Sequence, residues 1–207
     1  MPAETTVMAT GRKDISHLAG LATAYTWDTA AAAWLVPEVE NRSMVLMAWY
    51  SLLIEQALGN GYADWTKDRG AAAIWLDKTQ PSLALPHYLA PDRRLWPIRV
   101  QQLLEYQQLL DRCSPLGGHV RLAVLAASGD AAASLLDYRH HSLDRAGIPA
   151  FTAATNAEQV KVLTAAGYEL IPPCRLPGGQ ELLLLNRPSS PARCGSTMPA
   201  RPVRTVC

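Results

Sequence analysis

Features that mark several common protein classes are missing from this chain of 207 residues. The formal net charge is only +1, and no basic stripe, zinc-finger, helix-turn-helix or RRM pattern is present, so nucleic-acid binding is not expected. No run of about eighteen apolar residues occurs, and the N-terminus is polar rather than signal-like. We therefore expect a cytoplasmic protein without a membrane partner.

Cysteine is scarce and scattered. The four cysteines are Cys113, Cys174, Cys194 and Cys207, and no two of them have the C-x-x-C spacing. A metal site is therefore not expected, and reduced thiols are the default in the cytoplasm. The richness in Ala, Leu, Arg and Pro is typical of a bacterium with a GC-rich genome.

The chain does have enough apolar material for one well-buried domain, since hydrophobic residues make up 49% of the sequence. We predict a disordered N-terminus over residues 1–10, a folded domain over residues 11–188, and a disordered tail over residues 189–207. The tail has scattered small and polar residues and no apolar period.

Hydrophobic periodicity and turn residues predict mixed helices and strands. Helices are expected at Asp14–Thr23, in a short segment that reaches Leu35, and at Ser43–Leu58, Val100–Arg112, Ala131–Arg145 and Ala157–Ala166. Strands are expected at Tyr62–Thr66, Ala71–Leu76, Val120–Ala126, Ala150–Thr155, Tyr168–Arg175 and Glu181–Asn186. The prolines between Pro81 and Pro97 predict an irregular connection.

The segment from His119 to Phe151 is the most specific part of the sequence; it reads HVRLAVLAASGDAAASLLDYRHHSLDRAGIPAF. It resembles the central strand, turn and helix of the GNAT-family N-acetyltransferases. Sequence on both sides resembles the puromycin-acetyltransferase-like branch, so the likeness covers nearly all of the chain from Gly11 to Pro188. The resemblance implies an α/β (α+β) fold, with a twisted, mixed, mostly antiparallel sheet that carries helices on both faces and splays after its central strand.

The phosphate-binding turn of that family is shortened here. Relatives hold the pyrophosphate of acetyl-CoA on backbone N–H groups of a Q-G-R-G-x-G run, where glycines permit close approach. Only Ala131 to Ser134 separate Asp130 from Leu135, about five residues fewer than the family pattern. Asp130 would repel a phosphate or simply cap the following helix. We expect a degenerate CoA-binding motif and no bound cofactor.

The position of the family's catalytic acid has also changed. Counting back from Gly167-Tyr168, Gln159 stands where relatives commonly have Asn, and Leu163 stands where they have the Tyr that protonates the CoA thiolate. Leucine cannot donate a proton, so acid assistance of the family type is absent.

The first candidates for the acceptor side of the pocket are Trp27, Asp28 and His119. Asp28 could act as a base or bind a substrate cation, with Trp27 as a hydrophobic wall. The alternative is that Asp28 caps a helix beginning at Thr29. His119, at the start of the central strand, is a second catalytic candidate whose alternative role is packing.

Further candidates come from the proline-rich connection and an early strand. His87 is a catalytic candidate and Tyr88 a substrate-binding candidate, because this connection commonly lines the acceptor side in relatives. Trp65 is a third substrate-binding candidate, and on a strand it points to the face opposite Asp64. The pair His140-His141 is expected on the solvated face of its helix.

Three functions remain open. The first is a repurposed small-molecule enzyme of specialised metabolism, with tailoring or cyclising chemistry that needs no bound CoA. The second is a residual acyltransferase that moves an acyl group from a CoA or carrier-protein thioester onto a small amine or hydroxyl; backbone amides near Val124 to Ala127 would polarise the carbonyl. The third is a non-catalytic binding or regulatory protein. The expected partners are a small-molecule substrate and, for the second function, a carrier protein.

Overall fold

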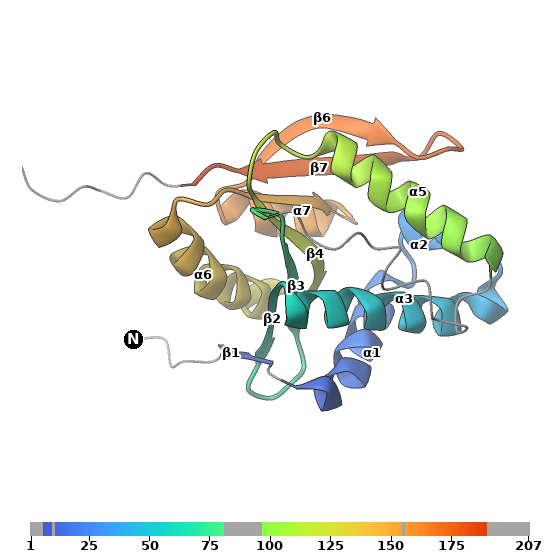
Figure 1. Cartoon of the computed structure of the whole chain (residues 1–207), viewed down its shortest axis with the longest axis horizontal. Helices are drawn as coiled ribbons and strands as arrows, with labels where there is room; N and C mark the ends of the chain where they lie inside the picture. Colours follow the sequence, from blue (N-terminus) through green and yellow to red (C-terminus); the bar gives the residue numbers. More distant parts are fainter. Residues whose placement is uncertain (1–5, 10, 81–96, 155, 190–207) are drawn as a thin grey trace, which may run out of the picture.

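The computed structural model describes residues 6–9, 11–80, 97–154 and 156–189, and Figure 1 shows their arrangement. The helices are η1 (Arg12–Asp14), α1 (Ile15–Thr26), α2 (Ala30–Leu35), α3 (Val39–Gly59), α5 (Pro97–Cys113), α6 (Gly129–Ala146) and α7 (Ala157–Ala165). The strands are β1 (Thr6–Met8), β2 (Gly61–Thr66), β3 (Ala72–Asp77), β4 (Val120–Ala126), β5 (Ala150–Ala154), β6 (Glu169–Arg175) and β7 (Glu181–Arg187).

All of these strands belong to one seven-stranded sheet with the order β1-β2-β3-β4-β5-β7-β6. Neighbouring strands are antiparallel except for β4 and β5, which run parallel. The predicted fold class, a mixed and mostly antiparallel sheet with helices on both faces, is confirmed.

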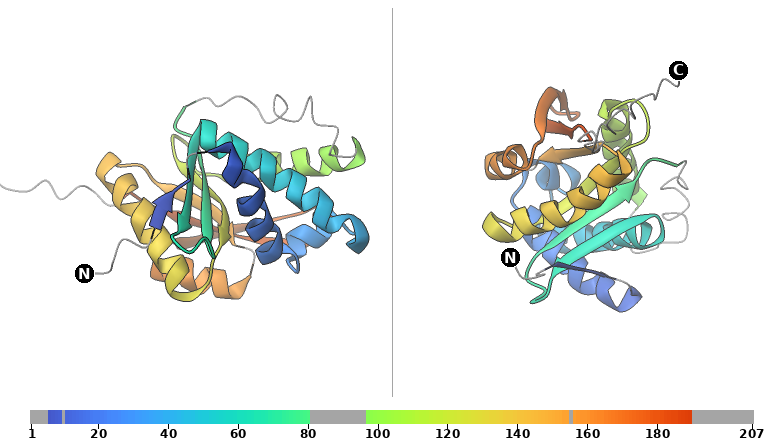
Figure 2. Two further views of the ribbon diagram at one scale, coloured as in Figure 1. Left: turned by 90° about the horizontal axis from the view of Figure 1, so that it is seen from below. Right: turned by 90° about the vertical axis from the view of Figure 1, so that its left-hand side faces the viewer.

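Each face of the sheet has its own apolar core. Helices α1, α2 and α3 cover one face, where the buried side chains include Leu18, Leu46, Trp49 and Ile74. Helices α6 and α7 cover the other face, where they include Trp75, Leu122, Leu135 and Tyr168. Figure 2 shows α3 and α6 on opposite sides of the strands. None of the helices in the described part of the chain is both long and apolar enough to cross a membrane.

The central strand β4 has the bounds predicted from the sequence. Its VRLAVLA run does not alternate between apolar and polar residues because helices cover both of its faces, as is usual for a strand in the middle of a layered fold. Helix α6 ends at Ala146, one residue beyond the predicted Arg145, and its C-cap is Gly147, whose φ of 68° lies in the left-handed region that favours glycine.

The structure differs from the sequence-based expectations at three places. Residues 1–10 were expected to be disordered, yet Thr6–Met8 form β1, which pairs with β2. Asp28 does not cap α2: the cap is Thr29, whose side chain accepts a hydrogen bond from the Ala32 N–H at 3.2 Å. His140 is buried rather than solvated, with 4% of its surface exposed, because its ring packs between Trp75 and Tyr168.

Candidate functional site

The sheet opens between β4 and β5, as the resemblance predicted. The two strands pair only at Val120, Arg121 and Leu122, although β4 continues to Ala126. The register between β3 and β4 shifts at the same point, so Ala123 is an extra residue in a β-bulge. A bulge bends its strand and increases the local twist, which separates β4 from β5.

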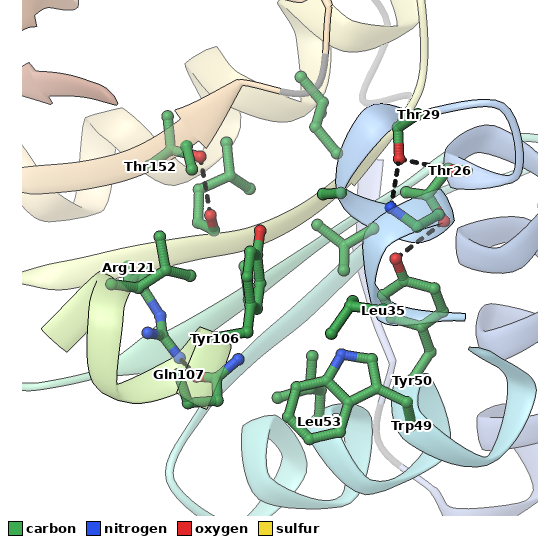
Figure 3. Close-up of a pocket in the computed structure, with 18 of the residues that line it drawn as sticks. Thr26, Thr29, Leu35, Trp49, Tyr50, Leu53, Tyr106, Gln107, Arg121 and Thr152 are labelled. Carbon is green, nitrogen blue, oxygen red and sulfur yellow. Dashed lines mark hydrogen bonds between the residues drawn. The ribbon is translucent and has the colours of Figure 1, made fainter. Parts of the chain in front are cut away.

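A cavity of about 50 Å³ lies beside this opening. Its wall is built from the end of α1, from α2, α3 and α5, and from the separated parts of β4, β5 and α7. A water molecule needs roughly 10–15 Å³ on such a measure, so the space holds a few waters or one terminal group of a small molecule. Figure 3 shows two polar clusters at opposite ends of the cavity, one around Thr26 and the other around Arg121.

The side chains of the cluster around Thr26 form hydrogen bonds with one another and with the nearby backbone. The Tyr50 hydroxyl donates to Thr26 Oγ1 at 2.8 Å, and Thr26 Oγ1 donates to the Ala22 carbonyl at 2.7 Å. Thr29 Oγ1 donates to the Thr26 carbonyl at 2.8 Å. Burial raises the pKa of Tyr50 far above its ordinary value, so the phenol stays protonated. These groups form a rigid polar wall rather than a reactive centre.

Tyr106, on α5, is the exception among the cavity's hydroxyl groups. Its hydroxyl has no hydrogen-bond partner among the described residues, and Figure 3 shows it pointing away from Gln107 and towards β4. Burial is the main cause that raises its pKa to about 12. The phenol is therefore protonated at neutral pH, and it can donate a hydrogen bond or a proton to a group in the cavity.

Arg121, which belongs to β4, lies beside Tyr106 of α5. Only 2% of the surface of Arg121 is exposed. Nη1 donates to Asp111 Oδ1 at 3.2 Å, and Nη2 donates to Gln107 Oε1. Nε is buried and has no hydrogen-bond partner among the described residues. Desolvation by burial is the main cause that lowers the pKa of Arg121 from its ordinary value, but a guanidinium still carries its charge at neutral pH.

Gln159 and Leu163, from α7, close the other side of the cavity. Gln159 Nε2 donates to the Leu125 carbonyl at 2.9 Å, so this side chain bridges the gap in the sheet. N–H and C=O of one strand residue point to the same side, so the Leu125 N–H also faces the gap. Leu163 is buried, at 1% exposure, in the place that the resemblance gives to a Tyr.

A second cavity, of about 90 Å³, lies on the outer side of Gln159. Its lining includes Ser128, Asn156 and Glu158 and no lysine or arginine. The turn from β4 to α6 consists of Ala127 and Ser128, and the side chain of Ser128 makes no capping hydrogen bond. The first turn of α6 carries the exposed Asp130.

The structure does not bring the predicted site residues together. Trp27 is half-buried with the Arg42 guanidinium over its ring at 5.4 Å, and the neighbouring Asp28 is exposed. Trp65 is buried at 4% exposure, packs edge-on against His17, and points away from Asp64 as expected. None of these residues lines the cavity beside the opening.

His119 is also outside that cavity. Its ring contacts Phe151 edge-on, its Nδ1 lies 3.1 Å from the Gly117 carbonyl oxygen, and burial lowers its pKa. These contacts correspond to the packing role that was its alternative. His87 and Tyr88 lie outside the described residues, as do Cys194 and Cys207. In the described ranges Cys113 and Cys174 are free thiols, and no group of three or more potential ligands is arranged to hold a metal.

Sequence reasoning missed the two residues that stand out in the structure. Arg121 had a visible signal, because it is a charged residue inside the otherwise apolar run VRLAVLA. Tyr106 had a weaker one: it lies next to Gln107 on a helix whose buried positions include Leu103 and Leu110. Neither pattern shows that the two side chains meet across a cavity.

Comparisons with known proteins identify the fold. No family model matches the sequence, and no curated protein matches it. Among solved structures, a Corynebacterium glutamicum protein described as histone acetyltransferase and related acetyltransferase has a TM-score of 0.59 at 19% identity, over 91% of this chain and 98% of that one. Arylalkylamine N-acetyltransferase 2 from Aedes aegypti has a TM-score of 0.59 at 10% identity, over 89% and 99%.

A third similar structure is the C-terminal condensation domain of Ebony in complex with β-alanyl-dopamine. Its TM-score is 0.54 at 12% identity, over 88% of this chain and 97% of that domain. The fold is therefore that of the GNAT N-acetyltransferases. Identities this low establish the fold and leave the activity to be argued from the site.

Proposed function

We propose that this protein is a small-molecule enzyme of the acyltransferase type, which takes its acyl group from a thioester without binding the pyrophosphate of CoA in the usual way. The observation that carries the proposal is the cavity at the opening of the sheet, which holds the protonated Tyr106 hydroxyl. The Leu125 backbone lies on the edge of the same opening.

The thioester, which is the electrophile of the reaction, would bind at the free edge of β4. A thioester carbonyl placed in the gap would accept a hydrogen bond from the Leu125 N–H, which stabilises the negative charge that develops on that oxygen. Gln159 must swing aside for this, since its side chain now bonds to the Leu125 carbonyl. The hydrogen bond from Gln159 Nε2 to the Leu125 carbonyl, worth about 1 kcal/mol, is exchanged in that movement.

The acid for the reaction would be Tyr106 in place of the missing tyrosine on α7. The acceptor amine or hydroxyl attacks the carbonyl carbon, the C–S bond breaks, and the thiolate takes the phenol proton. The proton lost by the acceptor returns to the Tyr106 oxygen, so the step is balanced without a metal or a redox partner. A positioned acid of this kind contributes roughly 10²–10⁴-fold to the rate.

The outer cavity supports a donor without a pyrophosphate. An anion at a helix N-terminus needs free backbone N–H groups and neighbouring positive charge. Here the turn is short, Glu158 lines the cavity, and Asp130 lies in the first turn of α6. The residues of this turn do not fit a pyrophosphate, so a carrier-bound or short thioester is the better donor.

One structural neighbour gives independent support for an acyl-transfer product. The solved structure of Ebony's domain is of its complex with β-alanyl-dopamine, which is the amide of an amino acid and an amine. It is called a condensation domain rather than an acetyltransferase, so the fold also occurs in a domain of that kind. The likeness is to the fold, and the proposal for this chain depends on Tyr106 and the opening of the sheet.

A comparison of two donors tests the proposal. Acetyl-CoA and the N-acetylcysteamine thioester of acetate present the same acyl group, but only acetyl-CoA has a pyrophosphate. With a panel of small amines and hydroxyl compounds, we expect kcat/KM for the two donors to agree within about tenfold, since no pyrophosphate contacts are made. A preference for acetyl-CoA of about 10³-fold or more, equivalent to about 4 kcal/mol, would contradict the proposed donor site.

A second candidate is chemistry that needs no thioester, such as cyclisation of a bound small molecule. The hydrogen bond from Gln159 to Leu125 favours it, because this bond closes the gap through which a thioester would enter. The variant Gln159→Ala separates the two functions. The rate of acyl transfer should rise or persist in this variant. An enzyme that needs no thioester should not become more active when the gap is opened. Absence of transfer from every thioester, in both proteins, would leave the second candidate or a non-catalytic binding role.

A further inference from the structure

We propose that the Arg121 end of the cavity is a subsite for a carboxylate, so that one of the two substrates is a small carboxylate-bearing molecule rather than a simple amine. This inference rests on the proposed function and names its substrate class. It is carried by a buried guanidinium with an unpartnered Nε at one end of the cavity and by the local surplus of positive charge.

Arg121 has a hydrogen-bond donor that an anion could use. A guanidinium binds a carboxylate best through two parallel N–H bonds, and Nε with one of the Nη atoms forms such a pair. Among the described residues, Nη1 and Nη2 each donate to a side chain, but Nε donates to none. A buried donor without a partner costs about 1–3 kcal/mol, so a ligand or a bound water is expected there.

The charges around Arg121 do not balance. Asp111 is the acid that pairs with it, and Asp111 Oδ1 also lies 3.6 Å from Lys78 Nζ. One carboxylate thus serves two cations, and its side chain is 53% exposed, so water screens it. His119, the neighbouring base, is held neutral by burial. Among the described residues, one positive charge is therefore left without a fixed partner beside the cavity.

The other groups at this end suit a carboxylate better than a phosphate. The Tyr106 side chain lies beside Arg121 and interacts electrostatically with it. The cavity of about 50 Å³ has space for one terminal group only. Apolar residues such as Trp49, Leu53 and Leu110 line the remainder, which fits a short carbon chain leading away from the carboxylate.

Propionate and propionamide test the subsite, because they have nearly the same shape and differ in charge. Binding to the full chain would be measured by NMR titration. We expect propionate to bind at least about tenfold more tightly than propionamide, and Arg121→Met to remove the difference. Equal affinities in the wild-type protein would overturn the inference, and so would no binding of either probe.

Asp111→Asn keeps the proposal testable if Arg121→Met fails to fold. This variant removes the competing carboxylate and leaves Arg121 in place, so propionate should bind several-fold more tightly than to the wild type. If Arg121 served only to hold α5 against β4 through Asp111, the variant would weaken propionate binding or leave it unchanged. Either of those results counts against the subsite.

The two proposals fail in different ways. If acyl transfer to neutral amines occurs from short thioesters and propionate is not preferred to propionamide, the carboxylate subsite is wrong and the enzyme proposal stands. If propionate is preferred but no thioester supports transfer to any acceptor, the subsite stands and the acyl-transfer proposal is wrong.

Discussion

Two buried arginines on opposite faces of the sheet show how differently one side chain can be used. Arg139, on α6, meets Asp64 of β2 with two hydrogen bonds, at 2.9 Å from Nε and 2.5 Å from Nη2. Its guanidinium also stacks 3.7 Å from the ring centre of Tyr62. Arg121 has a half-exposed acid that it shares with Lys78, and a buried Nε without a partner.

This difference indicates that the Arg139 charge stabilises the fold and that the Arg121 charge is available to bind a ligand at the site. Arg139 and Asp64 form a buried ion pair with two hydrogen bonds, so each charge has its partner within the fold. Arg121 faces a cavity with its charge only partly compensated. Removing the first should damage stability, and removing the second should damage binding.

The largest effect is expected from Arg139→Met. The change leaves the Asp64 carboxylate buried at 0% exposure without its cation, so the free energy of unfolding should fall by about 3–5 kcal/mol in urea denaturation. The double variant Asp64→Leu with Arg139→Leu is the matched control, because it removes both charges and should lose much less. A loss below about 1 kcal/mol for Arg139→Met would show that the pair does not hold α6 on the sheet.

Acid should destabilise the α6 face through His140. Burial is the main cause that lowers the pKa of His140 to about 3, against about 6.5 in the unfolded chain. The unfolded state therefore binds more protons between these values, so stability falls as pH decreases below 6.5, by up to about 1.4 kcal/mol per pH unit. His140→Gln should flatten this slope, and His141→Gln, at the exposed neighbouring position, should not. Parallel slopes for all three proteins would contradict the burial of His140.

On the cavity face, Tyr106→Phe should affect turnover rather than folding. Loss of the phenol proton should lower kcat for acyl transfer by roughly 10²-fold, equivalent to about 2.7 kcal/mol, with the melting temperature nearly unchanged. Tyr138→Phe, on the exposed side of α6, is the control and should retain full kcat. Full activity of Tyr106→Phe with a short thioester would remove this residue from the proton transfer.

Of the two arginine variants, Arg121→Met should have the smaller effect on stability. The variant removes a buried cation that is only partly compensated, and Asp111 remains in contact with water and Lys78. The free energy of unfolding should therefore change by about 1 kcal/mol or less in the same urea experiment. A loss as large as that of Arg139→Met would mean that both arginines are structural.

The resemblance to the GNAT family predicted the fold, and several element bounds could be predicted because the evidence for them is local. The bounds of β4 follow from an apolar run between Gly118 and Ser128, and helix ends follow from residues such as Gly59 and Gly147. A strand before Lys13 was considered, but β1 was not placed at Thr6–Met8 because three residues carry little pattern and their partner is the distant β2. His140 was placed on the surface because Tyr168, which covers it, is 28 residues away.

The site was harder to predict because it depends on one bulge. Ala123 shifts the register of β4, and only then do the side chains of α5 and the edge of Leu125 face the same space. No residue pattern along the sequence marks that shift. The resemblance located the opening of the sheet correctly, but it directed attention to Trp27, Asp28 and His119, which lie outside the cavity.

Ligand-dependent stability tests most directly whether the two arginines have separate roles. Propionate at about ten times its dissociation constant should stabilise the wild type by about 1.4 kcal/mol, measured as a shift in urea denaturation. The double variant Asp64→Leu with Arg139→Leu should gain the same increment, and Arg121→Met should gain none. Equal stabilisation of all three proteins, or of none, would contradict the assignment of Arg121 to the site.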